Sequence, residues 1–218
     1  MDKQQELSAL VEDLQFVKKA IAKSGNIMRY IDVSGGLALV GLWGGIFTII
    51  IAAAAYLLSS RYGTYGDAPT AYRVGIYLLI AATLAIAGLS KLRLFLGKAR
   101  KLDRNITVDK LFDEIYTTQL LNILIPFITA IAVLLIFLIT RELTIYIVPT
   151  LSILVGLLCV SYLNIFQLRE LVVVGDWLVA TGLIALFTAE AVHPLLAVIY
   201  TFGVGFTTTY FAYKLMRK

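Results

Sequence analysis

The chain has very few residues of the kinds that build metal sites. Its 218 residues include one cysteine and one histidine. Cys159 stands in an apolar run, and a single cysteine can form neither a disulfide within the chain nor a cysteine-rich metal site. His193 belongs to a Glu190-x-x-His193 sequence that crosses a turn, and this one pair supplies too few ligands for a metal centre. We therefore predict no metal site.

Enzyme motifs are also lacking. The sequence contains no H-E-x-x-H motif, no glycine-rich loop ending in Gly-Lys-Ser, and no serine, histidine and aspartate in one hydrophobic neighbourhood. We predict no catalytic residues and no cofactor, and we expect that the protein is not an enzyme.

Charged residues are scarce and apolar residues abundant. Only 15 % of the residues are charged and 60 % are hydrophobic, against about 25 % and about 45–50 % in soluble domains. Lipid must therefore replace water around most of the chain. The net charge of +5 is explained by the basic residues that collect in cytoplasmic loops. The predicted surroundings are a lipid bilayer, and no motif points to nucleic acid.

Six apolar runs follow one another along the chain. They cover residues 33–58, 74–97, 119–140, 143–166, 171–189 and 194–213. Each is close to the ~20 residues that cross a ~30 Å hydrocarbon layer as a helix. Since a spanning segment must satisfy its own backbone hydrogen bonds, we predict an all-α polytopic protein whose six transmembrane helices form antiparallel hairpins.

Basic residues are distributed unevenly between the two sides of this arrangement. Of the 19 lysines and arginines, only Arg61, Arg73 and Arg141 fall on the side opposite the termini. The positive-inside rule then places both termini in the cytoplasm. We predict a multipass protein of the cell membrane, that is, an inner-membrane protein.

The segment 1–30 has the pattern of an amphipathic cytoplasmic helix. Its acidic residues come early and its lysines late, which suits the helix dipole. Apolar residues recur at alternating spacings of three and four, and this stripe is expected to be buried against protein. The partner could be the helix expected at 107–119, a second copy in a homo-oligomer or another membrane subunit, and binding to the membrane surface is the alternative. The stripe consists of Leu7, Leu10, Leu14, Val17 and Ile21.

The rest of the chain, residues 31–218, is predicted to form one six-helix transmembrane domain. Between the second and third runs, a cytoplasmic helical hairpin is expected around 98–118. Thr107 is the expected N-cap of its second helix, with Asp109 in the first turn.

Glycines crowd the first apolar run. Gly41-x-x-x-Gly45 places two small residues on one helix face, which lets another helix approach closely. We favour packing within the chain over dimerisation as the role of this motif.

Two ionisable residues fall inside the apolar runs. Asp176 is about six residues, or about 9 Å, into the fifth run, and Lys91 lies at a similar depth in the second. A carboxylate in a membrane is expensive and is often functional. Asp176 and Lys91 could form a buried ion pair, or Asp176 could be a proton or cation site. Alternatively, both could reach the headgroup region.

Three functions are compatible with this sequence. The first is a non-catalytic scaffold, regulatory or accessory subunit, supported by the apolar stripe and by the scarcity of polar residues in the runs. The second is a small transporter or channel that uses Asp176, although a permeation path normally needs more intramembrane polarity. The third, a lipid-processing enzyme, lacks any reactive constellation. We favour the first.

Overall fold

The computed structural model describes residues 34–102, 106–161 and 169–216, and within these ranges all regular structure is helical. The segment 1–30 and its stripe lie outside the described residues and stay a prediction. The helices are α2 (Ser34–Tyr62), α3 (Thr70–Leu102), α4 (Val108–Ile115), α5 (Thr118–Thr140), α6 (Ile147–Ser161), α8 (Arg169–Phe187), α9 (Pro194–Val198) and α10 (Val204–Met216). Three short segments are η2 (Tyr65–Asp67), η3 (Thr144–Tyr146) and η4 (Ile199–Gly203).

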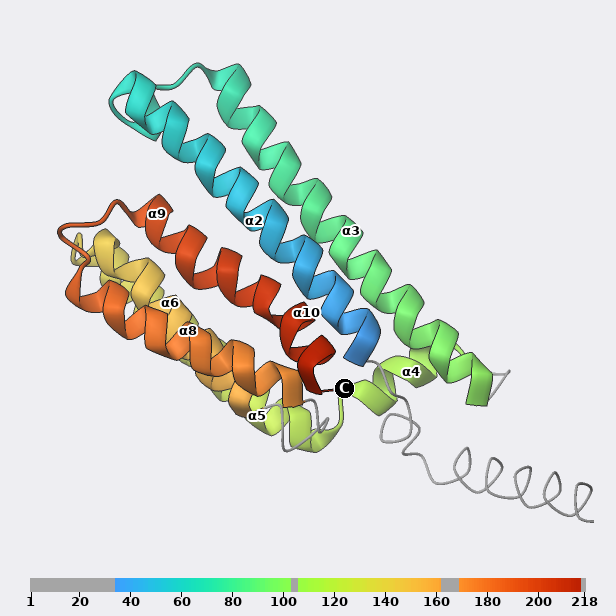
Figure 1. Ribbon diagram of the computed structural model, residues 1–218. Helices are drawn as coiled ribbons and strands as arrows, with labels where there is room; N and C mark the ends of the chain where they lie inside the picture. The colour runs from blue at the N-terminus through green and yellow to red at the C-terminus, as the bar shows by residue number, and fades with distance from the viewer. Residues whose placement is uncertain (1–33, 103–105, 162–168, 217–218) are drawn as a thin grey trace, which may run out of the picture.

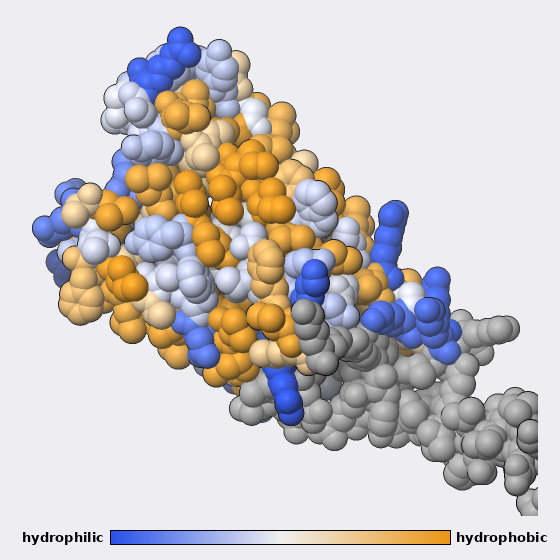
Figure 2. Space-filling view, viewed as in Figure 1, coloured by the Kyte–Doolittle hydropathy of each residue, from blue (hydrophilic) through white to orange (hydrophobic). Residues whose placement is uncertain are grey.

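Six helical segments in the described part of the chain are long and apolar enough to cross a membrane. They are α2, α3, α5, the combination of η3 and α6, α8, and the continuous unit of α9, η4 and α10. The prediction of an all-α chain with six such helices is confirmed. Figure 2 shows hydrophobic residues along the body of the molecule and hydrophilic residues gathered toward its ends, as expected for a multipass membrane protein.

The helices form an open row. Contacts link α3 to α2, α2 to α9 and α10, α10 to α8, α8 to α6, and α6 to α5. Figure 1 shows α2 and α3 on one side of α9 and α10, with α8, α6 and α5 on the other. Although α3 and α5 are neighbours in the sequence, they stand at opposite ends of the row. The fold therefore has a well-packed centre and two helices with little cover.

Along the helix axes, the molecule has two ends, and each is named here after one residue that lies there. At the Tyr65 end are η2 and the turns at 141–143 and 188–193. At the Lys214 end are α4, the start of α8 and the end of α10.

Helix α4 is the second helix of the expected hairpin. It follows α3, which continues past the apolar run to Leu102, and the Thr107 hydroxyl accepts a hydrogen bond from the Lys110 N–H at 3.3 Å. The predicted N-cap is thus confirmed. Leu111 on α4 is completely buried, whereas Phe112 is exposed. The helix is therefore held to the bundle by one side.

A π-helical segment, η4, interrupts the last span. The N–H of Val204 donates to the carbonyl oxygens of Ile199 and Thr201. In a regular α-helix it would donate to the Tyr200 carbonyl instead. Such segments are rare and often accompany functional sites. This one inserts an extra residue between α9 and α10. The side chains of α10 are therefore rotated about the helix axis relative to where an uninterrupted α-helix would place them.

Candidate functional site

Gly41 and Gly45 lie on the side of α2 that packs against η4 and α10. A Cβ added to Gly41 would stand 2.7 Å from the Thr209 hydroxyl oxygen, and one added to Gly45 would stand 2.6 Å from the Gly203 carbonyl oxygen. Both distances are shorter than any normal contact, so α2 approaches this closely only because these positions are glycine. The contact lies within a single chain.

A second glycine-mediated contact joins α6 and α8. A Cβ on Gly156 would lie 2.7 Å from the Gly175 carbonyl oxygen, and the reverse distance is also 2.7 Å. The fully buried Ser152 hydroxyl donates a hydrogen bond to the Leu178 carbonyl at 2.7 Å. We did not predict this contact, because its glycines lie singly on two different helices and form no GxxxG motif.

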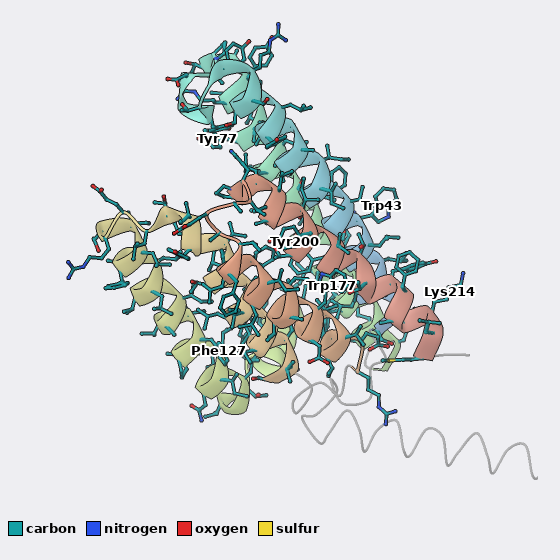
Figure 3. All side chains as sticks on the ribbon, turned by 60° about the vertical axis from the view of Figure 1, so that its left-hand side comes forward. Trp43, Tyr77, Phe127, Trp177, Tyr200 and Lys214 are labelled. Atoms are coloured by element: carbon teal, nitrogen blue, oxygen red, sulfur yellow. The ribbon has the colours of Figure 1, made fainter. Side chains whose placement is uncertain are left out.

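A side-chain hydrogen bond ties α8 to the π-helical segment. The Trp177 indole N–H donates to the Tyr200 carbonyl at 3.0 Å, and Figure 3 labels both residues on their neighbouring helices. This is the carbonyl that would accept from the Val204 N–H in a regular α-helix, but the π-helical segment directs that N–H to Ile199 and Thr201. The sequence alone gave no signal for this bond, because nothing in the sequence indicates where a helix will take up an extra residue.

Asp176 lies on the outward side of α8. Gly175 and Gly182 face α6, and Trp177 and Leu178 approach Gly205 of α10. At 100° per residue, these contacts leave Asp176 at the middle of the remaining side. Its neighbours on this side are exposed: Ala180, Leu183 and Phe187. We call these four residues the α8 outer face. No described residue bonds to the Asp176 carboxylate.

Lys91 and Asp176 are not brought together. Lys91 is exposed on α3, Asp176 is exposed on α8, and α2 and α10 stand between these two helices in the row. No ion pair joins them within the described residues. The fold does not bring the two residues together, because the main contact of α3 among the described spans is with α2.

A groove of about 520 Å³ opens near the Tyr65 end between the α2–α3 hairpin and α9. Figure 1 shows α2 and α9 separating toward this end. The lining is almost entirely apolar, and representative residues are Ala52 and Ala55 of α2, Ile76 and Ile80 of α3, and Leu195 and Val198 of α9. No sequence motif indicates this groove, since its shape depends on the angle between helices.

Polar side chains gather where the groove reaches the Tyr65 end. Tyr65 and Tyr77 line it there, with their rings 6.3 Å apart and edge to face. Arg73 lies one turn before Tyr77 on α3. Burial, followed by the nearby Tyr77, raises the pKa of Tyr65 above its usual value, while Arg73 acts to lower it. The Tyr65 phenol is therefore neutral at physiological pH and able to donate a hydrogen bond.

His193 has a structural position in the turn before α9. Its Nδ1 accepts a hydrogen bond from the Leu195 N–H at 3.2 Å, and its ring meets Tyr56 edge to face at 5.1 Å. Among the residues that the structure describes, no three histidine, cysteine, aspartate or glutamate side chains gather as metal ligands would.

The chain matches no protein family, no curated protein and no solved structure.

Proposed function

We propose that this protein is a non-catalytic scaffold or accessory subunit of the cell membrane that binds another membrane protein through the α8 outer face. One observation carries the proposal. A carboxylate, Asp176, stands at the centre of a helix face that no other described helix covers.

The depth of Asp176 makes lipid an unfavourable neighbour. It follows Arg169, the first residue of α8, by seven positions, or about 10 Å of helix. A carboxylate in the hydrocarbon layer costs a few kcal/mol, so intramembrane carboxylates usually have partners. A helix of another subunit could supply one through a lysine, an arginine or an amide.

The residues beside Asp176 suit an approaching helix. Ala180, one turn away, is small enough to allow close contact. Leu183 and Phe187 continue the same face, and the Phe187 side chain is 87 % exposed. Large exposed apolar side chains near a polar anchor are a common composition for a helix interface.

The orientation follows from the basic residues. We place the Lys214 end in the cytoplasm of an inner membrane, by the positive-inside rule. Asp176 then lies in the cytoplasmic half of the bilayer. The predicted stripe of residues 1–30 would give the same partner, or a second copy, an additional contact on that side.

Affinity purification from native membranes in a mild detergent tests the proposal. Asp176→Asn and Asp176→Leu should lower the yield of a co-purifying membrane subunit at least about tenfold, if the pair is worth more than ~1.4 kcal/mol. Asp176→Glu should retain the subunit. Glu190→Gln is the matched control, because it removes an exposed carboxylate at the Tyr65 end.

Site-specific crosslinking tests the location of the contact. A photoreactive residue at Ala180 should crosslink to the subunit, and one at Ala82, which is exposed on α3, should not. The same subunits recovered in equal yield with Asp176→Leu would contradict the proposal.

Transport through Asp176 is the alternative hypothesis from the sequence. It requires a path lined by this carboxylate, and no described residue across the α8 outer face provides the second wall. Proton flux into liposomes carrying the purified protein separates the two functions. The scaffold proposal expects no flux from the wild type. Flux that Asp176→Asn abolishes would favour transport.

A further inference from the structure

The groove between α2, α3 and α9 has the length of one leaflet. It runs from Tyr65 to Thr48 and Leu84. Its α3 wall from Ile76 to Leu84 covers nine residues, or about 12 Å of helix. One leaflet of a ~30 Å hydrocarbon core is about 15 Å thick. The groove thus reaches from the Tyr65 end of the molecule to near the middle of the membrane.

The walls of the groove offer no free polar group below this end. Two threonines line it, but both hydroxyls donate to carbonyls of their own helices, Thr48 to Gly44 and Thr83 to Leu79, each at 2.8 Å. The other lining residues in this part are aliphatic. A ligand held here must therefore be apolar along its length. Because Leu84 is 68 % exposed, the groove is also open toward the surrounding lipid.

The Tyr65 phenol and the Arg73 guanidinium lie near each other at the Tyr65 end of the groove. The Arg73 Nε is buried and has no hydrogen-bond partner, and the Tyr65 hydroxyl is buried beside Tyr77. The rest of the Arg73 guanidinium is anchored, since an Nη donates to the Thr70 hydroxyl at 3.3 Å. Buried donors without partners are uncommon in folded proteins. Arg73 acts electrostatically on Tyr65, so its guanidinium lies near a residue that lines the groove at this end.

We propose that the groove binds an anionic phospholipid of the leaflet at the Tyr65 end, with an acyl chain along Ile76–Leu84 and the phosphate at Arg73 and Tyr65. The positive charge of Arg73 and the Tyr65 hydroxyl complement a phosphate, and the aliphatic walls complement the chain. A transmembrane helix of a partner fits less well, because α2 and α9 converge toward the middle of the membrane and narrow the groove. This site is independent of the α8 outer face.

Native mass spectrometry of the full chain in detergent tests the proposal. Phosphatidylglycerol with 16-carbon chains should bind more tightly than phosphatidylcholine with the same chains. Arg73→Gln should weaken phosphatidylglycerol binding about fivefold, the effect of about one basic residue at an anionic surface. Arg61→Gln, which removes the same charge from the end of α2, is the matched control and should leave binding unchanged.

The acyl chain is tested on α3. Thr83→Phe fills the groove and should abolish binding of both lipids. Ala82→Phe adds a ring at the adjacent exposed position, outside the groove, and should bind as the wild type does. If Thr83→Phe does not fold, as judged by circular dichroism, then Ile80→Trp fills the groove from the next turn. Glycerol phosphate, which has no chain, should not compete.

Two results would overturn the proposal. One is an equal loss of phosphatidylglycerol binding in Arg73→Gln and Arg61→Gln, which would indicate general attraction to positive charge. The other is wild-type binding in a folded groove-filling variant. Neither result bears on the partner contact at Asp176, which has its own assay.

Discussion

Gly45 of α2 and the glycines of α3 stand in opposite surroundings. A Cβ on Gly45 of α2 would lie 2.6 Å from the Gly203 carbonyl oxygen, whereas one on Gly75, Gly88 or Gly97 of α3 would meet nothing within 4 Å. The same residue type is thus a requirement for packing in one helix and a local weakness in its neighbour, because glycine lowers helix propensity. The frequency of glycine in a span does not by itself reveal which helix is central.

Burial divides the spans in the same way. In the most apolar windows of α8 and of the α9–α10 unit, 33 % of the residues are buried, compared with 6 % in α3 and in α5. The center of the row is therefore fixed by close backbone contacts. The helices at the two ends of the row, α3 and α5, have surfaces that face lipid or other subunits. The following variants test that division, from the largest expected effect to the smallest.

Gly45→Leu should be the most damaging single substitution. Its side chain would collide with the backbone at Gly203 and Thr207 as well as with the Thr207 methyl group. Overpacking of this kind costs about 3 kcal/mol or more. We expect a large fall in the melting temperature in detergent, measured by circular dichroism. Gly88→Leu adds the same atoms to α3 and should melt close to the wild type. Equal losses in both variants would refute the division.

Gly156→Ala should have an intermediate effect. The added methyl would stand 2.7 Å from the Gly175 carbonyl oxygen, and separating α6 from α8 by a few tenths of an ångström should cost about 1–3 kcal/mol. Gly175→Ala breaks the same contact from the other helix. Because both variants separate the same pair, the double variant should cost less than the sum of the two. Strict additivity in thermal unfolding would show that the two positions act independently.

Ser152→Ala should be milder. It removes a buried hydrogen bond to the Leu178 carbonyl, and such bonds between membrane helices average about 0.6 kcal/mol. Ser161→Ala is the matched control on the same helix, since that hydroxyl donates to the Leu157 carbonyl of its own helix. A lower melting temperature is expected for Ser152→Ala alone. A greater loss in Ser161→Ala would argue against the contact.

Gly88→Ala should have the smallest effect, and its sign should be opposite. Alanine at this open position meets nothing within 4 Å and favours helix by up to about 1 kcal/mol. The melting temperature should stay the same or rise slightly. A clear fall would show that α3 has a close neighbour at Gly88, such as a second copy.

The sequence predicted the helices better than their contacts. Hydrophobic run length indicated all six spans, and the spacing of Thr107 and Asp109 indicated where α4 begins, because both signals are local. The Gly41–Gly45 motif is local as well. The pairing of Gly156 with Gly175 depends on two helices meeting at one register, which no single segment contains. The groove and the outward direction of Asp176 likewise depend on which helices are neighbours, and this could not be read from residue types.

The π-helical segment η4 also determines which way the side chains of α10 point around the helix axis. In an uninterrupted α-helix, the residue four positions after Val198 is Phe202, and it would take the direction that Gly203 takes here. A phenyl ring would then face Gly45, where the structure has only a glycine backbone. Deleting one residue within Ile199–Gly203 would thus be more disruptive than most substitutions there, because it would turn Thr207, Thr209 and the rest of α10 by about 100°.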